Sequence, residues 1–200
     1  MSQRRLILAS ASPRRRELLD QLGVSFTCIP AHIDESHRVD ETPSNYVKRM
    51  AQEKGRAIAL LQPALGWAVL AADTIVVISG TVLGKPKDRA DALHMLMALS
   101  GRQHSVFTAL SLVTVTGMVC QLVETKVEFM SLSDATCEAY LATDEPWDKA
   151  GSYGIQGLAG AFVRSIEGSY SNVVGLPLCE TCKLLSSNGV STALNAAPLD

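Results

Sequence analysis

The sequence predicts an α/β protein in which helices flank a mixed, twisted sheet. The chain opens with a β-α-β pattern, because an apolar strand at 5–10 runs into a helix at 13–22 that is followed by a second strand at 26–30. Two long β-rich stretches, at 105–115 and 119–129, are separated only by a Thr-Gly turn, and their length is typical of an antiparallel pair. Parallel and antiparallel pairing within one chain indicate a mixed sheet.

The first helix has clear end signals. Ser12 is a good N-cap, Pro13 suits the first helical position because its φ is already helical, and Gly23 ends the helix. Apolar periodicity and turn residues predict the remaining elements. They are a long amphipathic helix from Thr42-Pro43-Ser44 to about Leu61, a buried strand at 68–78, a turn at Ser79-Gly80 into a short strand at 81–83, and helices at 89–99, 133–142 and 175–187.

Four glycines recur at a three-residue period late in the chain: Gly151, Gly154, Gly157 and Gly160. A loop that needs positive φ or a close backbone approach to a ligand would explain this pattern. A plain flexible connection is the alternative. Beyond residue 187 the chain has few large apolar residues, so we expect 188–200 to be a frayed tail.

Composition sets the class of protein. With 200 residues and 47% hydrophobic content, the chain can bury a core as one domain over 1–187, either undivided or with two lobes. The 20 acidic residues nearly balance the 18 Lys and Arg, which argues against a broad basic surface for nucleic acid. Any anion that binds should therefore be small and bound locally.

The sequence also bears on location. No apolar stretch approaches the roughly 20 residues that span a bilayer, and the N-terminal apolar segment is too short for a signal peptide, so we expect a cytoplasmic protein without membrane contact. The five cysteines are an odd number at irregular spacing, which indicates reduced thiols. Cys179 and Cys182 have the C-x-x-C form but no second pair, so helix packing explains them better than a metal or redox role.

The first turn of the first helix carries an unusual charge. Arg14, Arg15 and Arg16 stand at the positive end of the helix dipole, where each cation costs roughly 0.3 to 1 kcal/mol. Backbone N–H groups, the hydroxyls of Ser10 and Ser12, and guanidinium groups at one strand-to-helix turn would form a phosphate site. The alternative is that the arginines form a solvated face.

A second unusual charge is Asp73, which interrupts an otherwise apolar strand. Burying an unpaired carboxylate costs several kcal/mol, so Asp73 should face a cleft, a cation or a metal. A structural ion pair is the alternative. Lys54, Lys85 and Glu35 are unremarkable individually and would usually be surface residues.

Together these side chains fit phosphoanhydride hydrolysis. That reaction needs cations to hold the phosphates, carboxylates to hold a divalent metal, and a base or metal to activate water. The arginines at 14 and 15 with Lys54 and Lys85 would supply the cations, and Glu35 and Asp73 would supply the carboxylates. The chain has no G-x-x-x-x-G-K-[ST] loop and no G-x-S-x-G elbow, which argues against P-loop and serine-hydrolase chemistry.

At these residues the chain resembles the Maf family of nucleoside triphosphate pyrophosphatases, and the resemblance covers nearly its whole length. Ordered motifs at suitable separations carry it. They are Leu6 through Arg15, Ala72-Asp73-Thr74, Gly84-Lys85-Pro86, Asp148 through Gly157, and Val174-Gly175-Leu176-Pro177.

The resemblance implies hydrolysis of a nucleoside triphosphate to the monophosphate and pyrophosphate with Mg²⁺ or Mn²⁺. It also implies an α/β fold similar to the inosine triphosphatases, with two lobes around a central cleft. By motif, Asp73 would be the proton acceptor and, with Glu35, a metal ligand. Lys54 and Lys85 would complete the polar cleft, and the phosphates would be bound by a set of four residues: Ser10, Ser12, Arg14 and Arg15.

The resemblance extends to the branch acting on dTTP and UTP. In that branch three positions set base choice, and here they hold Arg14, Thr74 and Gln156, whereas the 7-methyl-GTP branch has Trp, Gln and Glu. Thr and Gln can both donate to and accept from a pyrimidine edge. Two positions depart from the family pattern, since Gly55 stands where Ala is usual and Gly84 where a charged residue is frequent. Either change could loosen how the neighbouring lysines are held.

The sequence therefore predicts a metal-dependent, house-cleaning pyrophosphatase for dTTP, UTP and modified pyrimidine nucleotides. The alternative is a nucleotide-sensing regulator that binds without significant turnover, although the retained Asp73, Glu35, Lys54 and Lys85 argue for turnover. A nucleic-acid-binding module is disfavoured by the near-neutral charge and by having only four Phe and four Tyr for base stacking. A homodimer is left open.

Overall fold

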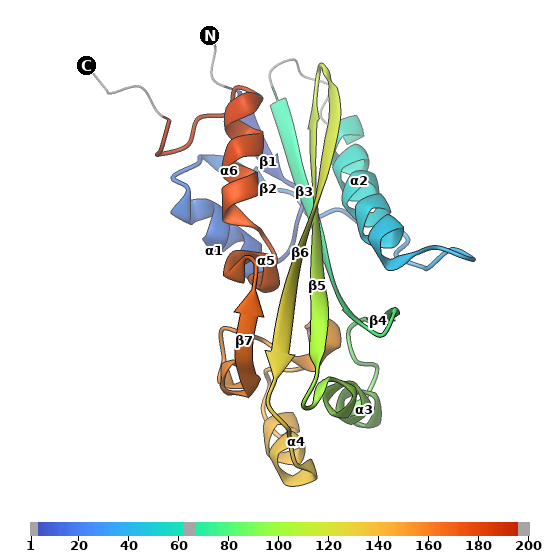
Figure 1. Ribbon diagram of the computed structural model, residues 1–200. Helices are drawn as coiled ribbons and strands as arrows, with labels where there is room; N and C mark the ends of the chain where they lie inside the picture. Colours follow the sequence, from blue (N-terminus) through green and yellow to red (C-terminus); the bar gives the residue numbers. More distant parts are fainter. Residues whose placement is uncertain (1–3, 62–66, 196–200) are drawn as a thin grey trace. The chain divides into compact units, whose positions relative to one another are not determined.

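The computed structural model describes residues 4–61 and 67–195 (Figure 1). Its helical elements are α1 (Pro13–Gln21), α2 (Pro43–Leu61), α3 (Arg89–Leu99), α4 (Asp134–Leu141), α5 (Tyr170–Val174), α6 (Leu178–Ser187) and the 3₁₀ turns η1 (Ala150–Ser152) and η2 (Leu158–Phe162). Its strands are β1 (Arg5–Leu8), β2 (Phe26–Cys28), β3 (Trp67–Ile78), β4 (Thr81–Leu83), β5 (Gln103–Thr114), β6 (Gly117–Phe129) and β7 (Val163–Glu167).

In this part of the chain the seven strands form one sheet in the order β2-β1-β3-β5-β6-β7, with β4 paired to β3. Strand β1 pairs in parallel with β2 and β3, whereas β4 pairs antiparallel to β3 and β7 antiparallel to β6. The neighbouring strands β5 and β6 are joined by residues 115–116 alone, a connection so short that it requires antiparallel strands. The α/β fold with a mixed sheet is confirmed.

The chain divides into two compact units. Unit 1 is Met1–Asp73, Thr108–Val123 and Gly175–Asp200, and unit 2 is Thr74–Phe107 and Glu124–Val174. The division falls inside β3, β5 and β6, each of which contributes residues to both units. Two lobes were expected. The cleft expected between them, and a single domain over 1–187, stay predictions.

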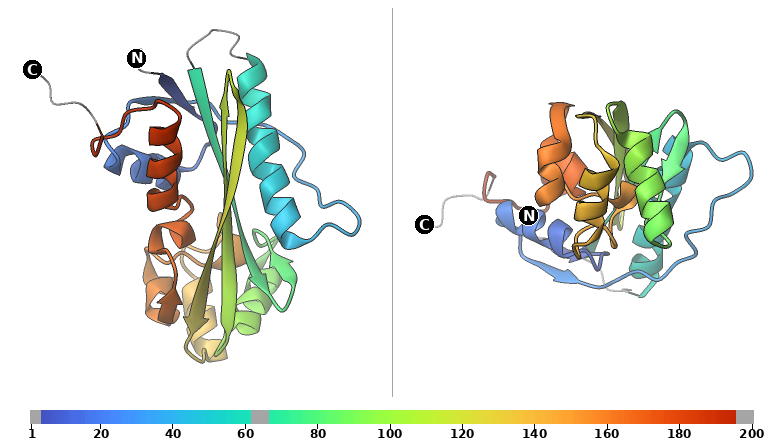
Figure 2. Two further views of the ribbon diagram at one scale, coloured as in Figure 1. Left: turned by 45° about the horizontal axis from the view of Figure 1, so that its top comes forward. Right: turned by 90° about the horizontal axis from the view of Figure 1, so that it is seen from below.

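In unit 1 the side chains of β1 and β3 alternate between two faces. On one face Ile7, Val69 and Ala71 pack against Ile58 of α2. Figures 1 and 2 show α2 on one side of these strands, with α1 and α6 on the other side. Since side chains alternate along a strand, both faces must be apolar when helices cover both. This explains the unbroken apolar stretch that precedes Asp73.

Gly55 lets α2 lie close to the sheet. A Cβ at this position would meet Val113 Cγ2 at 3.1 Å and Ser111 Oγ at 3.3 Å. Glycine here permits close packing, and the expectation that Gly55 loosens the hold on Lys54 stays a prediction.

The core of unit 2 is rich in aromatic residues. Phe129 makes edge-to-face contacts with His104, Tyr153 and Phe162, whose ring centroids lie 5.0, 4.8 and 6.0 Å away. The turn between β3 and β4 has positive φ at both central residues, 49° at Ser79 and 80° at Gly80, as tight hairpins require.

Several predicted boundaries shift. Helix α6 begins at Leu178, with Pro177 as its N-cap, and not at 175. The β-strand at Val163–Glu167 was not predicted. The tail also differs from expectation, because Val190 and Thr192 are buried and Ala193 N donates to Leu22 O over 2.8 Å. The expected fraying is therefore wrong for 190–193, and 196–200 lie outside the described residues.

Among the helices that the structure describes, none is both long and apolar enough to cross a membrane.

Candidate functional site

Lys54 joins the two carboxylates that the sequence singled out. Its Nζ lies 2.7 Å from Glu35 Oε1 and 2.7 Å from Asp73 Oδ1. The three residues come from different places in unit 1: Glu35 from the connection between β2 and α2, Lys54 from α2, and Asp73 from β3. The structure thus brings three of the four expected catalytic residues into direct contact.

Asp73 is buried beside positive charge. Its side chain and that of Lys54 are each only 12% exposed, whereas the Glu35 side chain is 57% exposed. Burial raises the pKa of Asp73, and the charges of Lys54 and Arg15 act in the opposite direction. The alternative of a structural ion pair explains the contact between Asp73 and Lys54. It does not explain why the exposed carboxylate of Glu35 contacts the same lysine amine.

The N-terminus of α1 forms a polar turn. Ser12 caps the helix through its Oγ, which accepts from Arg15 N at 3.4 Å. Ser10 Oγ accepts from Ser12 N at 3.1 Å and from Arg15 Nη1 at 3.5 Å. The Arg15 guanidinium also donates to Gly175 O at 2.9 Å. These contacts fold Arg15 back over the turn, so the arginine does not extend into solvent as the alternative reading required.

Arg15 also connects this turn electrostatically to the carboxylates. Burial lowers the pKa of Arg15, and the charges of Asp73 and Glu35 raise it while that of Arg14 lowers it. The positive charges on α1 and α2 and the carboxylates of β3 and of the loop before α2 thus interact electrostatically within unit 1.

Three predicted site residues belong to unit 2. Thr74 follows Asp73 in β3 and is half-buried, while Lys85 after β4 and Gln156 between η1 and η2 are exposed. The grouping of Thr74, Lys85 and Gln156 with the residues of unit 1 stays a prediction. Gly84 O accepts from Gly151 N at 3.0 Å, which places the backbone next to Lys85 against the start of the Gly-rich segment.

Glu145 organises the Gly-rich segment, a role that the sequence analysis missed. Its carboxylate accepts from Leu158 N at 2.8 Å, from Ala159 N at 3.3 Å and from Tyr140 Oη at 2.9 Å. A Cβ on Gly157 would overlap this carboxylate. At Gly157 the close backbone approach is made to a side chain of the same chain, and Gly151 has the expected positive φ of 71°. The approach to a ligand stays a prediction.

The donor set fits a divalent cation that arrives with a phosphate ligand. Across residues 4–61 and 67–195, no group of three His, Cys, Asp or Glu side chains could hold a metal ion by itself. Mg²⁺ is commonly bound by one or two carboxylates together with waters and substrate phosphates. Glu35 and Asp73, held near each other by Lys54, provide two such carboxylates.

Comparison with known proteins gives a consistent family assignment. Residues 5–188 match the Maf family model, described as Maf-like protein. The chain is 53% identical over 191 residues to a dTTP/UTP pyrophosphatase of Shewanella oneidensis, covering 92% of this chain and 98% of that protein. It is 52% identical over 182 residues to a dTTP/UTP pyrophosphatase of Escherichia coli K12, covering 91% and 92%.

Similarity to solved structures is weaker. The Staphylococcus aureus Ham1 protein is 13% identical with a TM-score of 0.41, over 65% of this chain and 72% of that one. Protein VC0702 from Vibrio cholerae is 11% identical with a TM-score of 0.35, over 66% of each chain.

Proposed function

Because this chain belongs to the Maf family, we propose that it hydrolyses dTTP and UTP to the nucleoside monophosphate and pyrophosphate. The observation that carries this proposal is the 53% identity, over 92% of the chain, to a relative named for that activity. Contact of Lys54 with both Glu35 and Asp73 supports it, since these residue types suit phosphoanhydride chemistry. The expected substrates include modified pyrimidine nucleotides, which would give the enzyme a house-cleaning role.

The proposed reaction is a single displacement at the α phosphorus. A bond forms between the oxygen of a water molecule and the α phosphorus, and the bond from that phosphorus to the α–β bridging oxygen breaks. Pyrophosphate leaves with the bonding electrons. Asp73 accepts the proton lost by the water.

Cations would hold the triphosphate. Arg14, Arg15 and the hydroxyls of Ser10 and Ser12 stand at the N-terminal turn of α1, where the helix dipole and the backbone N–H groups favour phosphate. Lys54 would exchange part of its contact with the two carboxylates for a phosphate oxygen. From unit 2, Lys85 would add a further positive charge.

A divalent cation, Mg²⁺ or Mn²⁺, would be held by Glu35 and Asp73. When bound, it would offset part of the negative charge of the triphosphate. Without a cation the two carboxylates would repel the substrate. The positive charge of Lys54 compensates their negative charge while no metal is bound.

Base choice would rest on Arg14, Thr74 and Gln156. An amide and a hydroxyl can each donate to or accept from the edge of thymine or uracil. Glu145 supports this role indirectly, because it holds the backbone at Leu158 and Ala159, shortly after Gln156. We expect the enzyme to act in the cytoplasm on a free nucleotide, and a homodimer remains compatible with this function.

A product assay tests the proposed function. Nucleoside triphosphates bearing thymine, uracil, cytosine, adenine and guanine, and 7-methyl-GTP, are incubated with the protein and Mg²⁺ or Mn²⁺, and pyrophosphate is measured separately from orthophosphate. We expect pyrophosphate release that is fastest with dTTP and UTP and absent with EDTA. Tight binding of dTTP without product would instead support the nucleotide-sensing regulator.

A further inference from the structure

The loop that carries Glu35 has no regular secondary structure. It connects β2, which ends at Cys28, with α2, which begins at Pro43. Ordering such a segment costs conformational entropy at every residue, and the Glu35 side chain is 57% exposed. Contacts other than burial must therefore hold Glu35 at its 2.7 Å distance from Lys54 Nζ.

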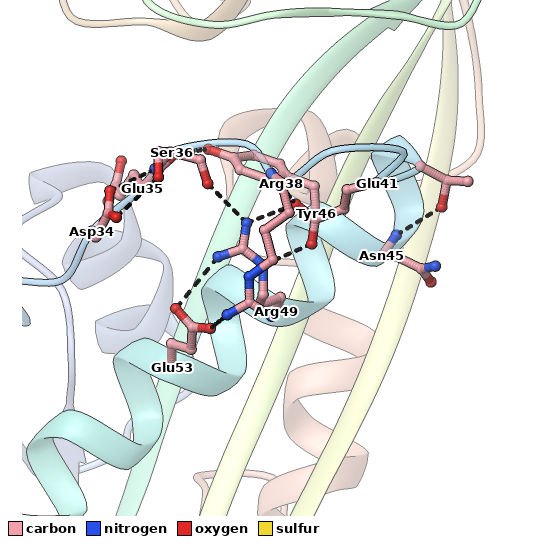
Figure 3. Close-up of polar contacts among 10 residues, drawn as sticks. Asp34, Glu35, Ser36, Arg38, Glu41, Asn45, Tyr46, Arg49 and Glu53 are labelled. Atoms are coloured by element: carbon pink, nitrogen blue, oxygen red, sulfur yellow. Dashed lines mark hydrogen bonds and ion pairs between the residues drawn. The ribbon is translucent and has the colours of Figure 1, made fainter.

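Two side chains of α2 hold the backbone at and beside Glu35 (Figure 3). Tyr46 Oη donates to Glu35 O at 2.9 Å, and Arg49 Nη2 donates to Ser36 O at 2.9 Å. Residues three positions apart lie on the same side of a helix. Tyr46 and Arg49 therefore hydrogen-bond two consecutive loop carbonyls from one face of α2. Burial raises the pKa of Tyr46 to about 12, and its hydroxyl therefore remains a donor at neutral pH.

A partly buried charge pair fixes the other end of the loop. Arg49 donates from Nε to Glu41 Oε1 and from Nη2 to Glu41 Oε2, each at 2.6 Å. The two side chains are only 13% and 8% exposed, which makes this a bidentate pair largely shielded from water. Hydrogen bonds from the Arg49 guanidinium lower the pKa of Glu41 to about 2. The pair therefore stays charged at any pH where the enzyme would work.

Neighbouring groups add to this network. Glu53, one turn further along α2, accepts from Arg49 Nη1 at 3.5 Å and from Arg38 Nη2 at 3.1 Å. His37 stacks on the Tyr46 ring with centroids 3.7 Å apart, and Arg49 Cζ lies 5.5 Å from the centroid of the same ring. Glu35 and the loop residues that follow it are thus bound to α2, the helix that also carries Lys54.

We propose that Tyr46 and Arg49 are positioning residues that keep Glu35 in contact with Lys54 and beside Asp73. The role rests on the proposed function, because it concerns the carboxylate assigned to hold the metal. Neither side chain needs to touch the nucleotide. They act through Glu35, so the effect of removing them depends on whether Glu35 is present.

The most selective variant is Tyr46→Phe, which removes one hydroxyl and leaves the stacking ring. We expect kcat/KM for dTTP to fall about tenfold, since misplacing a catalytic group by 1 Å can cost about a hundredfold. The matched control is Tyr170→Phe, which removes a hydroxyl from a residue of unit 2 that is 49% exposed and should leave activity unchanged.

The discriminating measurement repeats Tyr46→Phe in a Glu35→Gln background. If Tyr46 acts through Glu35, the second substitution causes no further loss, because residues acting as one unit are strongly non-additive. An equal loss in both backgrounds would show that Tyr46 merely supports the fold and would overturn the proposal. Unchanged activity of Tyr46→Phe in the wild-type background would also overturn it.

A second variant gives a readout independent of activity. Arg49→Gln removes the bidentate pair, and Arg56→Gln, an exposed position on the same helix, removes the same charge as its control. We expect faster amide hydrogen exchange across 35–41 in Arg49→Gln only. Unchanged exchange in this segment would refute the proposal. Absence of turnover in the wild-type protein would instead refute the proposed function, and the exchange result would still decide whether Arg49 holds the loop.

Discussion

Asp73 Oδ1 and Lys54 Nζ lie 2.7 Å apart with both side chains nearly buried. Removing either partner would leave an unpaired charge in a nearly buried position, which would destabilise the folded protein. The same amine also contacts Glu35, so one lysine compensates the two carboxylates that would meet the substrate's metal.

Asp73→Asn should preserve the fold and remove most turnover. The substitution is nearly isosteric, but it removes the charge that would accept a proton. Loss of a general base typically lowers the rate by about 10² to 10⁴, which steady-state kinetics with dTTP and Mg²⁺ would measure. Asp20→Asn on the exposed side of α1 is the matched control. Near wild-type turnover of the Asp73→Asn variant would exclude Asp73 as the base.

The burial of His104 as a neutral side chain should make the folded protein less stable in mild acid, where the unfolded chain protonates this residue. Its Nε2 lies 2.9 Å from Tyr153 Oη, its Nδ1 finds no hydrogen-bond partner among residues 4–61 and 67–195, and burial lowers its pKa to about 4. The unfolded chain takes up this proton near pH 6.5. Stability is therefore fully present above pH 6.5 and is lost as the pH falls toward 4, by about 3 kcal/mol in total.

Urea unfolding of the wild type and His104→Phe at pH 7.5 and pH 4.5 would test this prediction. Other groups titrate in both proteins, so the difference between the two pH dependences isolates His104. The variant should lose less stability than the wild type on acidification. Parallel losses would mean that His104 is protonated in the folded protein as readily as in the unfolded chain.

The local parts of the fold could be predicted because their signals are adjacent in sequence. Ser12, Pro13 and Gly23 mark the ends of α1, and α3 runs from Arg89 to Leu99 as predicted. Asp73 could be singled out because burying an unpaired carboxylate in an apolar strand costs free energy. In the structure it forms an ion pair with Lys54.

The parts that could not be predicted depend on contacts between distant residues. Nothing near Gly157 in sequence signals that Glu145 binds the backbone beside it. The tail beyond residue 187 has few large apolar residues, yet Ala193 N donates to Leu22 O. Arg49 likewise resembles any charged residue of an amphipathic helix until the loop is seen to fold back over it.

Gln156→Glu should change base preference. The substitution replaces an amide that donates and accepts with a carboxylate that only accepts, so a carbonyl of thymine or uracil would lose its donor. An unpaired buried polar group costs about 1 to 3 kcal/mol, or roughly 5- to 150-fold in kcat/KM. Kinetics with dTTP, UTP and 7-methyl-GTP would measure this, and the guanine nucleotide should lose least. A uniform change across all three would show that Gln156 does not contact the base.

Glu145→Gln should loosen the segment that follows Gln156. A glutamine offers only one acceptor oxygen to the donors Leu158 N, Ala159 N and Tyr140 Oη, and its NH₂ group would face an N–H. We expect a loss of about 1 to 3 kcal/mol in the free energy of unfolding, together with faster hydrogen exchange over 154–160. Glu17→Gln, an exposed change on α1, is the control, and equal stability of the two variants would contradict the role of Glu145.

Hydrolysis of dTTP in ¹⁸O-labelled water tests the central claim most directly, because it reports which phosphorus the water attacks. Mass spectrometry of the products should find the label in dTMP, with unlabelled pyrophosphate as the other product. Label in orthophosphate, with dTDP as the accompanying product, would contradict attack at the α phosphorus and with it the proposed pyrophosphatase activity.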